Sequence, residues 1–310
     1  MRVGLVDLGT NSIRYDIYEV EKDQPAKMLH RDKEMIRLGQ GLFTSGEIAP
    51  EALERLLTSL SHFQNVSAKN GVDHLEAFAT CALREANHSE DIRRLLKKET
   101  GIQFRVISGD EEAQLIAQGI LNNDPRCRGS FALIDIGGGS TELSLCKSKR
   151  RESSVSLPLG VARVQQRFLQ TIPPKSLEGL EAYFQSITPS LAALNLKTSP
   201  EFAFGSSGTI KALSRIHRKL YDTTEINLKE LQKTIEMIRP MGRNEISKIP
   251  GMNPKRIDFI LAGAYILEYS MKALGIKKVI HTPFALRDGI LNQVTRQFGA
   301  LPPLKPKKQS

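Results

Sequence analysis

Two acidic side chains flank a run of glycines at residues 133–142, LIDIGGGSTE. Asp135 stands two positions before three consecutive glycines, and Glu142 follows them after a serine and a threonine. Glycine lets the backbone turn sharply, and exposed N–H groups in such a turn form a concavity that binds anions. Carboxylate oxygens suit Mg²⁺, which commonly binds together with phosphate. The spacing therefore indicates phosphate chemistry, with a tight β-hairpin that binds no ligand as the alternative.

A second copy of this unit lies at the N-terminus. Residues 3–18 read VGLVDLGTNSIRYDIY, and residues 131–146 read FALIDIGGGSTELSLC. A constant offset of 128 residues pairs Asp7 with Asp135, Gly9 with Gly137, and Ser12 with Ser140. Each copy has an apolar strand, an aspartate, a glycine turn and a second strand. Repetition of a whole supersecondary unit indicates two related halves, each with a hairpin that cradles phosphate.

A third glycine turn, GSSGT, occupies residues 205–209 between an expected strand and an expected helix. The first N–H groups of a helix have no partner within the helix, and the helix dipole adds positive potential there. Such an N-terminus is a ready site for an anion. A single turn of this kind is common, but three in one chain strengthen the prediction of phosphate binding.

Two further charged residues could act on a phosphate. Arg84, in ATCALREA, follows an expected strand and could clamp phosphate bidentately, with a solvent-facing arginine as the alternative. Glu112, in GDEEAQL, stands at the start of an expected helix. It could orient and deprotonate a water molecule, whereas a purely structural role would be to complement the helix dipole.

Other chemistries find little support in the sequence. It contains no P-loop motif, no GxSxG nucleophile elbow and no HExxH zinc motif, so its six histidines are interpreted as surface or core residues. The three cysteines form no CxxC pair, which is typical of reduced, buried thiols in a cytoplasmic protein.

Composition and charge narrow the class of partner. The 310 residues are enough for one large or two ordinary domains, and no apolar run approaches the roughly 20 residues needed to span a bilayer. The chain also begins with an expected strand rather than a signal sequence, so we expect no membrane contact. A net charge of +10 fits a polyanionic partner. The lack of tryptophan and the aromatic content of 6% argue against nucleic acid as that partner.

Strands and helices must alternate to hold these residues in place. In the first half, strands are expected at 2–8, 12–20, 76–80 and 103–108, and helices at 50–65, 89–99 and 110–120. In the second half, the repeated hairpin is followed by strands at 154–160, 201–205 and 278–285. Helices are expected there at 161–169, 176–193, 208–218, 227–238, 256–274 and 286–297. The pattern predicts an α/β protein with mixed sheets.

The three glycine motifs together resemble those of the actin/hsp70/sugar-kinase superfamily. Within it, the chain resembles the exopolyphosphatase/guanosine pentaphosphate phosphohydrolase (Ppx/GppA) family, and the resemblance covers about residues 1–298. Further blocks that carry it are IRLGQGL, ATCALREA, ISGDEEAQLIAQGI, LPLGVARVQQRFL, KRIDFILAGAYILEYSMKALG and ALRDGIL. The resemblance implies two ribonuclease-H-like (actin-like ATPase) α/β domains with an interdomain cleft. We expect an N-terminal domain at 1–125 and a C-terminal domain at 126–310, with the last helix able to pack back toward the first.

The resemblance also implies a reaction and roles for residues. The reaction is hydrolysis of a terminal phosphoanhydride with Mg²⁺, or with Mn²⁺ as an alternative metal. Glu112 would be the catalytic base and Arg84 a phosphate clamp. Asp135 and Glu142 would be linked to the metal, and Asp7 is a third hard oxygen ligand of the same type. Predicted phosphate-binding residues are Gly9, Thr10, Asn11, Ser12, Gly137, Gly138, Gly139, Ser140, Thr141, Gly205, Ser206, Ser207 and Gly208.

Several functions stay open at this point. The first is an exopolyphosphatase that releases orthophosphate from inorganic polyphosphate, and the second is a 5′-phosphohydrolase of guanosine pentaphosphate (pppGpp). A non-catalytic sensor of polyphosphate or of the alarmone is a third, and an ATP-dependent sugar kinase is a fourth. The chain resembles the short, two-domain form of the family, which puts long-chain processivity in question. A homodimer is a possible assembly.

Overall fold

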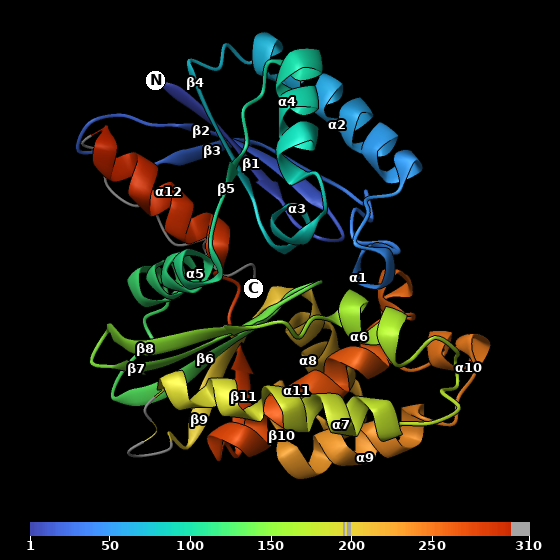
Figure 1. The fold of residues 1–310 in the computed structure, drawn as a ribbon. Coiled ribbons are helices and arrows are strands. Elements are labelled where there is room, and N and C mark those ends of the chain that lie inside the picture. Colours follow the sequence, from blue (N-terminus) through green and yellow to red (C-terminus); the bar gives the residue numbers. More distant parts are fainter. Residues whose placement is uncertain (195, 197–199, 299–310) are drawn as a thin grey trace. The chain divides into compact units, whose positions relative to one another are not determined.

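The computed structural model describes residues 1–194, 196 and 200–298 (Figure 1). These residues form two compact units. The first comprises residues 1–119 and, of the described residues, those from Leu286 to Phe298, and the second comprises residues 120–285. The chain passes from the first unit to the second within helix α5 (Gly109–Asn123) and returns just before helix α12 (Leu286–Gln297). The sequence analysis instead expected a single boundary near residue 125, with all later residues in the second domain.

The first unit contains a sheet of five strands in the order β3-β2-β1-β4-β5. Their bounds are β1 Arg2–Leu8, β2 Ile13–Glu19, β3 Lys27–Glu34, β4 His74–Ala79 and β5 Arg105–Val106. The first three strands pair antiparallel, and β4 and β5 are parallel to β1. The sequence did not predict β3, because this edge strand, KMLHRDKE, is rich in charged residues and buries no side chain fully. The strand expected at 103–108 pairs only at two residues.

Helices cover both faces of this sheet. The helices of this unit are α1 (Leu42–Ser45), α2 (Pro50–Lys69), α3 (Cys81–Glu85), α4 (Ser89–Thr100), the first part of α5, and α12, of which α2 and α12 contact the central strands. Successive side chains of a strand point to opposite faces. Tyr15 of β2 accordingly stacks on Phe63 of α2, whereas the carboxylate of Asp16 accepts a hydrogen bond of 2.6 Å from Arg287 of α12. Figure 1 shows α2 and α4 side by side, and α12 apart from them.

The second unit contains a sheet of six strands in the order β10-β11-β9-β6-β7-β8. Their bounds are β6 Ser130–Ile136, β7 Thr141–Lys147, β8 Arg150–Leu157, β9 Phe202–Ser206, β10 Glu225–Asn227 and β11 Lys278–His281. β6, β7 and β8 pair antiparallel, and β9 and β11 continue the sheet in parallel. Their order therefore repeats that of the first sheet, with β10 added at one edge. The strand expected at 278–285 ends at His281, two residues before Pro283, which has no N–H to donate.

Helices pack around the second sheet and bury a large apolar core. They are α6 (Val161–Arg167), α7 (Glu178–Ile187), α8 (Ser207–Tyr221), α9 (Leu228–Ile238), α10 (Arg243–Ser247) and α11 (Ile260–Leu274), with 3-10 helices η1 (Thr188–Leu194) and η2 (Pro254–Arg256). The helix expected at 176–193 thus changes to a 3-10 helix at Thr188, just before Pro189. Helix α11 is buried along most of its length, so it forms the centre of this core.

The sheet order 3-2-1-4-5, to which the second unit adds β10 at one edge, is that of a ribonuclease-H-like fold, which confirms the predicted fold class. The three cysteines are free and buried, as the sequence analysis expected. Burial raises the pKa of Cys127 and of Cys146 to about 12, so both are thiols at neutral pH. No helix among the described residues has the length and the apolar character needed to cross a bilayer.

Candidate active site

The two glycine hairpins have the same turn. In the first, the N–H of Gly9 donates to the carbonyl of Ser12 at 3.0 Å; in the second, Gly137 donates to Ser140 at 2.9 Å. A Cβ atom at Gly9 or Gly137 would lie 3.3 or 3.0 Å from the same carbonyl oxygen, which explains the glycine at both positions. The repeat found in the sequence is therefore a repeat of backbone geometry.

The carbonyl groups of the second hairpin turn are held by helix α6. The N–H of Val161 donates to the carbonyl of Gly137 at 3.1 Å, and the N–H of Ala162 to that of Gly138 at 2.8 Å. The guanidinium of Arg163, which is 7% exposed, donates from Nε to the carbonyl of Gly139 at 2.8 Å. In a trans peptide the N–H points opposite to the carbonyl. The N–H groups of residues 138–140 therefore point away from α6, in the orientation that anion binding requires.

The first hairpin turn is held in the same way. Gly39 donates its N–H to the carbonyl of Thr10 at 2.8 Å, and Arg37 to that of Asn11 at 3.0 Å. The N–H groups of Asn11 and Ser12 consequently point away from the segment 37–39. The predicted roles of residues 9–12 and 137–141 stay predictions, but both turns have the backbone orientation that these roles need.

Two glycines outside the predicted site allow this anchoring. A Cβ atom on Gly160 would lie 2.4 Å from the backbone of Gly138 and Gly139, and one on Gly39 would lie 2.2 Å from the side chain of Thr10. Sequence reasoning missed both as site residues. The sequence signal that could have identified these glycines is a Leu-Gly pair shortly after the third strand of each sheet. The pair occurs in the blocks IRLGQGL and LPLGVAR.

The GSSGT turn lies at the strand-to-helix junction where it was expected. β9 ends at Ser206, α8 begins at Ser207, and Ser206 pairs with Asp135 across the neighbouring strands. The hydroxyl of Ser206 donates a hydrogen bond to Oδ2 of Asp135. The structure thus brings two of the three predicted motifs together in the second unit, at the same end of the sheet.

An arginine that sequence reasoning missed lies beside this turn. A Cβ atom on Gly208 would lie 2.0 Å from Nη2 of Arg256, so the guanidinium covers the first turn of α8. Arg256 ends the 3-10 helix η2, far along the chain from the glycine turn. A phosphate at the helix N-terminus would therefore meet a fixed positive charge there as well.

Asp135 and Glu142 are directly opposite each other on β6 and β7. Glu142 is 3% exposed, and its Oε1 accepts a hydrogen bond of 2.8 Å from the hydroxyl of Ser156. Like charges that are opposite each other on neighbouring strands repel, so a bound cation would stabilise this pair. Mg²⁺ is usually bound by one or two carboxylates together with waters and substrate phosphates. The two side chains fit such an ion as a donor set.

Asp7 has a different partner from its counterpart Asp135. It pairs across the hairpin with Arg14, whose Nη1 lies 3.9 Å from Oδ2 of Asp7. The position opposite the aspartate thus holds an acidic residue, Glu142, in one hairpin and a basic residue, Arg14, in the other. Within residues 1–194, 196 and 200–298, no group of three or more His, Cys, Asp and Glu side chains is arranged to hold a metal. Asp7 lies in the first unit and Asp135 and Glu142 in the second, so the predicted set of three metal ligands stays a prediction.

Arg84 and Glu112 form an ion pair in the first unit. Arg84 lies on α3, directly after β4, and Glu112 lies in the first turn of α5 with 8% of its surface exposed. Nη1 of Arg84 donates to Oε2 of Glu112 at 3.2 Å and to the carbonyl of Ile107 at 2.7 Å. The neighbouring Glu111 instead pairs with Arg105. The structure thus distinguishes the two glutamates and brings only Glu112 to Arg84.

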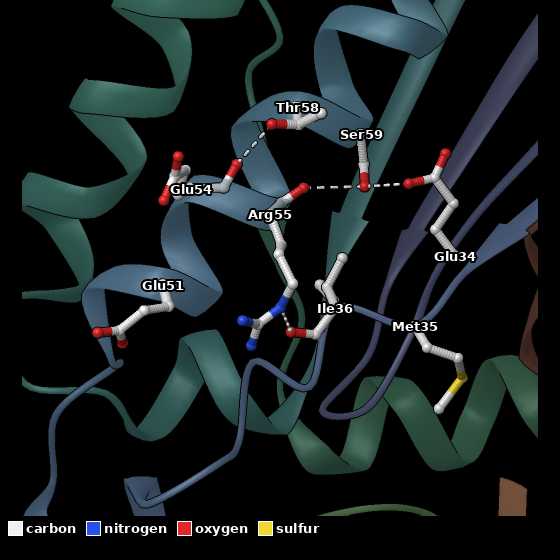
Figure 2. A pocket seen from close by; sticks show the side chains of 8 residues that line it. All are labelled: Glu34, Met35, Ile36, Glu51, Glu54, Arg55, Thr58 and Ser59. Atoms are coloured by element: carbon white, nitrogen blue, oxygen red, sulfur yellow. Dashed lines mark hydrogen bonds between the residues drawn. The ribbon is translucent and has the colours of Figure 1, made fainter.

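A hollow in the first unit carries the wrong charge for phosphate (Figure 2). It has a volume of about 600 Å³ and lies between the end of β3 and the start of α2, where Glu34, Glu51 and Glu54 line it. Ser59 donates to Glu34, and Arg55 donates to the carbonyl of Ile36 at 3.0 Å. Its carboxylates disfavour a polyanion. This hollow therefore does not belong to the candidate active site.

The fold and these side chains define a class of protein: a phosphoanhydride hydrolase built from two ribonuclease-H-like units. The model of the Ppx/GppA phosphatase family matches residues 17–298. The chain belongs to this family, which confirms the resemblance found in its sequence.

Named relatives and solved structures agree with this assignment. Exopolyphosphatase 1 of Mycobacterium leprae is 28% identical over 300 residues, which cover 94% of this chain and 88% of the relative. Exopolyphosphatase 1 of Mycobacterium tuberculosis is 29% identical over 301 residues, which cover 94% and 87% of the two chains. The crystal structure of an exopolyphosphatase from Cytophaga hutchinsonii has a TM-score of 0.83 at 26% identity, and the match covers 96% of this chain and 98% of that one.

Proposed function

We propose that the protein is an exopolyphosphatase, which hydrolyses the terminal phosphoanhydride of inorganic polyphosphate and releases orthophosphate. The observation that carries the proposal is the group of residues around Asp135 and Glu142. These opposed carboxylates lie at the two ends of a glycine loop whose N–H groups are turned away from α6. Relatives that match nearly the whole chain and are named exopolyphosphatases support the choice of substrate.

The chain's own groups would act mainly by positioning and by charge neutralisation, which is what phosphoryl transfer to water requires. The N–H groups of the glycine loops would bind phosphate oxygens. Glu112 would orient the attacking water and accept its proton. Both side-chain hydrogen bonds of Arg84 to described residues use Nη1, so Nη2 and Nε would remain for bidentate binding of a phosphate.

A divalent cation fits beside this loop. Asp135 and Glu142 would hold Mg²⁺, or Mn²⁺, and the ion would offset negative charge on the bound phosphates. The hydroxyl groups of Ser206 and Ser156, which donate to these two carboxylates, would keep the carboxylates in place.

Orthophosphate release in the presence of Mg²⁺ tests the proposal. Long-chain polyphosphate and pppGpp are compared at matched concentrations of terminal phosphate, and the variant Glu112→Gln, purified in the same way, reports any contaminating phosphatase. Faster release from polyphosphate is expected. A preference for pppGpp would assign the protein to alarmone hydrolysis. Tight binding of either compound without release would instead make it a sensor.

A further inference from the structure

A group of basic side chains lies at the end of the second sheet that is remote from the glycine loop. Ser130 at the start of β6 pairs with Lys147 at the end of β7, whereas the glycine loop joins the other ends of these strands. Lys147, Lys149 and Arg150 are exposed at the β7–β8 turn, and Arg128 is exposed just before β6. We call these four residues the basic patch. Figure 1 shows the β7–β8 turn at the left end of the sheet.

A backbone hydrogen bond brings the two parts of the patch together. The N–H of Ser148 donates to the carbonyl of Gly129 at 3.0 Å, which joins the β7–β8 turn to the segment before β6. Burial raises the pKa of Cys127 to about 12, and the positive charge of Lys149 opposes this rise. The patch is therefore one surface formed by two adjacent loops.

The four charges of the patch have no acidic partner within the described part of the chain. Among the residues that the structure describes, no carboxylate forms an ion pair with any of them. The contrast with Arg126 in the same loop is clear, because its Nη2 lies 2.6 Å from Oδ2 of Asp124. Four exposed cations without acidic partners produce a local positive potential that attracts anions.

The backbone of the β7–β8 turn is strained at the lysine that it exposes. Ser148 and Lys149 are consecutive left-handed residues, with φ of 48° and 65°. A two-residue hairpin turn of this kind strongly favours glycine or asparagine, since other residues are strained there. Strained backbone positions cluster at functional sites, so the strain at Lys149 motivates a functional hypothesis for this turn.

We propose that the basic patch anchors long-chain polyphosphate at a second site, remote from the loop where hydrolysis would occur. The six residue steps of β6 separate the two ends of the sheet by about 20 Å, at roughly 3.3 Å per residue. A long polyphosphate spans that distance, whereas tripolyphosphate does not. The patch would therefore lower the KM for long chains and leave the KM for short ones unchanged. The identity of the anion rests on the proposed function.

The patch favours polyphosphate over nucleic acid. Proteins that bind single-stranded nucleic acid usually stack bases on exposed aromatic side chains. Among the described residues, the large hydrophobic side chains that are exposed are Met1, Met28 and Phe298, none of which belongs to the patch. A surface of lysine and arginine alone can hold a chain of phosphates but has no platform for bases.

A triple variant tests the anchor. Lys147, Lys149 and Arg150 are each replaced by glutamine, and the control replaces three exposed lysines of the first unit, Lys69, Lys97 and Lys98, in the same way. Orthophosphate release is measured from tripolyphosphate and from long-chain polyphosphate over a range of salt concentrations. Since three phosphate contacts are lost, the slope of log KM against log salt for long chains should fall by about 2. At low salt this KM should rise roughly tenfold.

The inference holds if the patch variant alone shows these changes and its kinetics with tripolyphosphate equal those of the wild type. Unchanged kinetics with long chains would overturn it, and so would an equal loss with both substrates or with the control variant. Loss of RNA binding with polyphosphate kinetics intact would identify the patch as a nucleic-acid surface instead.

A second variant and a binding measurement separate this inference from the proposed function. Lys149→Gly removes one charge and relieves the strain, so its melting temperature should rise while its KM for long chains also rises. A lower KM for that variant would contradict the anchor. If the wild type releases no orthophosphate from any polyphosphate, the proposed function fails. The inference can then be tested by binding alone. The affinity of the Glu112→Gln protein for long-chain polyphosphate should fall when the three patch residues are also replaced by glutamine, and an unchanged affinity would overturn the inference.

Discussion

Nη1 of Arg84 lies 3.2 Å from Oε2 of Glu112, while the preceding residue, Glu111, pairs with Arg105. Adjacent glutamates at the start of one helix are thus directed to different partners. This difference provides a matched pair of variants for the proposed catalytic base.

Replacing Glu112 by glutamine should lower kcat for polyphosphate by roughly 10²–10⁴-fold, because a general base is lost while the size of the side chain is kept. Binding of substrate should persist. Glu111→Gln is the control and should keep near wild-type turnover. Steady-state orthophosphate release measures both variants. Near wild-type turnover of Glu112→Gln would show that another group is the base.

Replacing Glu142 by glutamine should weaken the binding of the metal more than it destabilises the fold. The variant keeps the hydrogen bond from Ser156 to the side-chain carbonyl oxygen but removes one of the two opposed negative charges. We expect the Mg²⁺ concentration for half-maximal activity to rise at least tenfold. Glu152→Gln, which changes an exposed acid on β8, is the control. The same Mg²⁺ requirement in wild type and variant would exclude Glu142 as a metal ligand.

Replacing Gly160 by alanine should damage the glycine loop through steric overlap. The new Cβ atom would lie 2.4 Å from the backbone of Gly138, so the loop must move. We expect a loss of stability of about 1–3 kcal/mol, typical of overpacking, together with a fall in activity. Gly179→Ala on α7 is the control, since its Cβ atom would meet nothing closer than 3.4 Å. Chemical denaturation and orthophosphate release measure the two effects, and unchanged activity would refute a role for the anchored loop.

Replacing Arg256 by alanine should raise the KM for polyphosphate without destroying the fold. Its guanidinium covers the first turn of α8 at Gly208, where a phosphate would bind. Loss of one hydrogen-bonded charge typically costs about 1.5–3 kcal/mol, or roughly 10- to 150-fold. Lys255→Ala changes the exposed neighbour in η2 and should have no such effect. An increase in KM of equal size in both variants would indicate loss of general charge rather than a specific contact.

Acid should destabilise the protein through His217. Burial lowers the pKa of His217 to about 4, although Glu230 lies 3.9 Å from its Nδ1 and opposes this effect. In the unfolded chain the pKa is about 6.5, so the unfolded state binds the proton first. The contribution to stability is present above pH 6.5 and is lost as the pH falls toward 4, at up to about 1.4 kcal/mol per pH unit.

Urea denaturation at pH 7, 5.5 and 4.5 measures this loss. His217→Leu should show a shallower dependence of unfolding free energy on pH than the wild type. The exposed His88 provides the control, because His88→Asn should keep the wild-type slope. An unchanged slope in His217→Leu would mean that other groups cause the acid sensitivity.

Most of the fold could be predicted from local patterns in the sequence. The alternation of strands and helices and the repeated Asp-x-Gly hairpin could be read because each depends on residues that are near one another in the chain. β3 could not be read, since its charged residues belong to a sheet edge rather than to an alternating apolar face. A strand of this kind is specified by its neighbour β2 and not by its own composition.

The places of the candidate site residues in the fold could be predicted in part for the same reason. Glu112, Arg84 and the glycine turns stand in short motifs, and their positions at the ends of strands follow from those motifs. The guanidinium of Arg256 against Gly208 and the approach of Gly160 to Gly138 join segments that are distant in sequence. No spacing in a single sequence shows such contacts, because they depend on how whole elements pack.

The hydrogen bonds that hold the carbonyl groups of both hairpin turns have a consequence for ligand recognition. Since folding itself fixes the turns at residues 10–11 and 137–139, little conformational entropy remains to be lost when a phosphate arrives. Recognition by these loops would then be that of a preformed receptor, in which selectivity comes from the shape of the anion and not from a rearrangement of the protein.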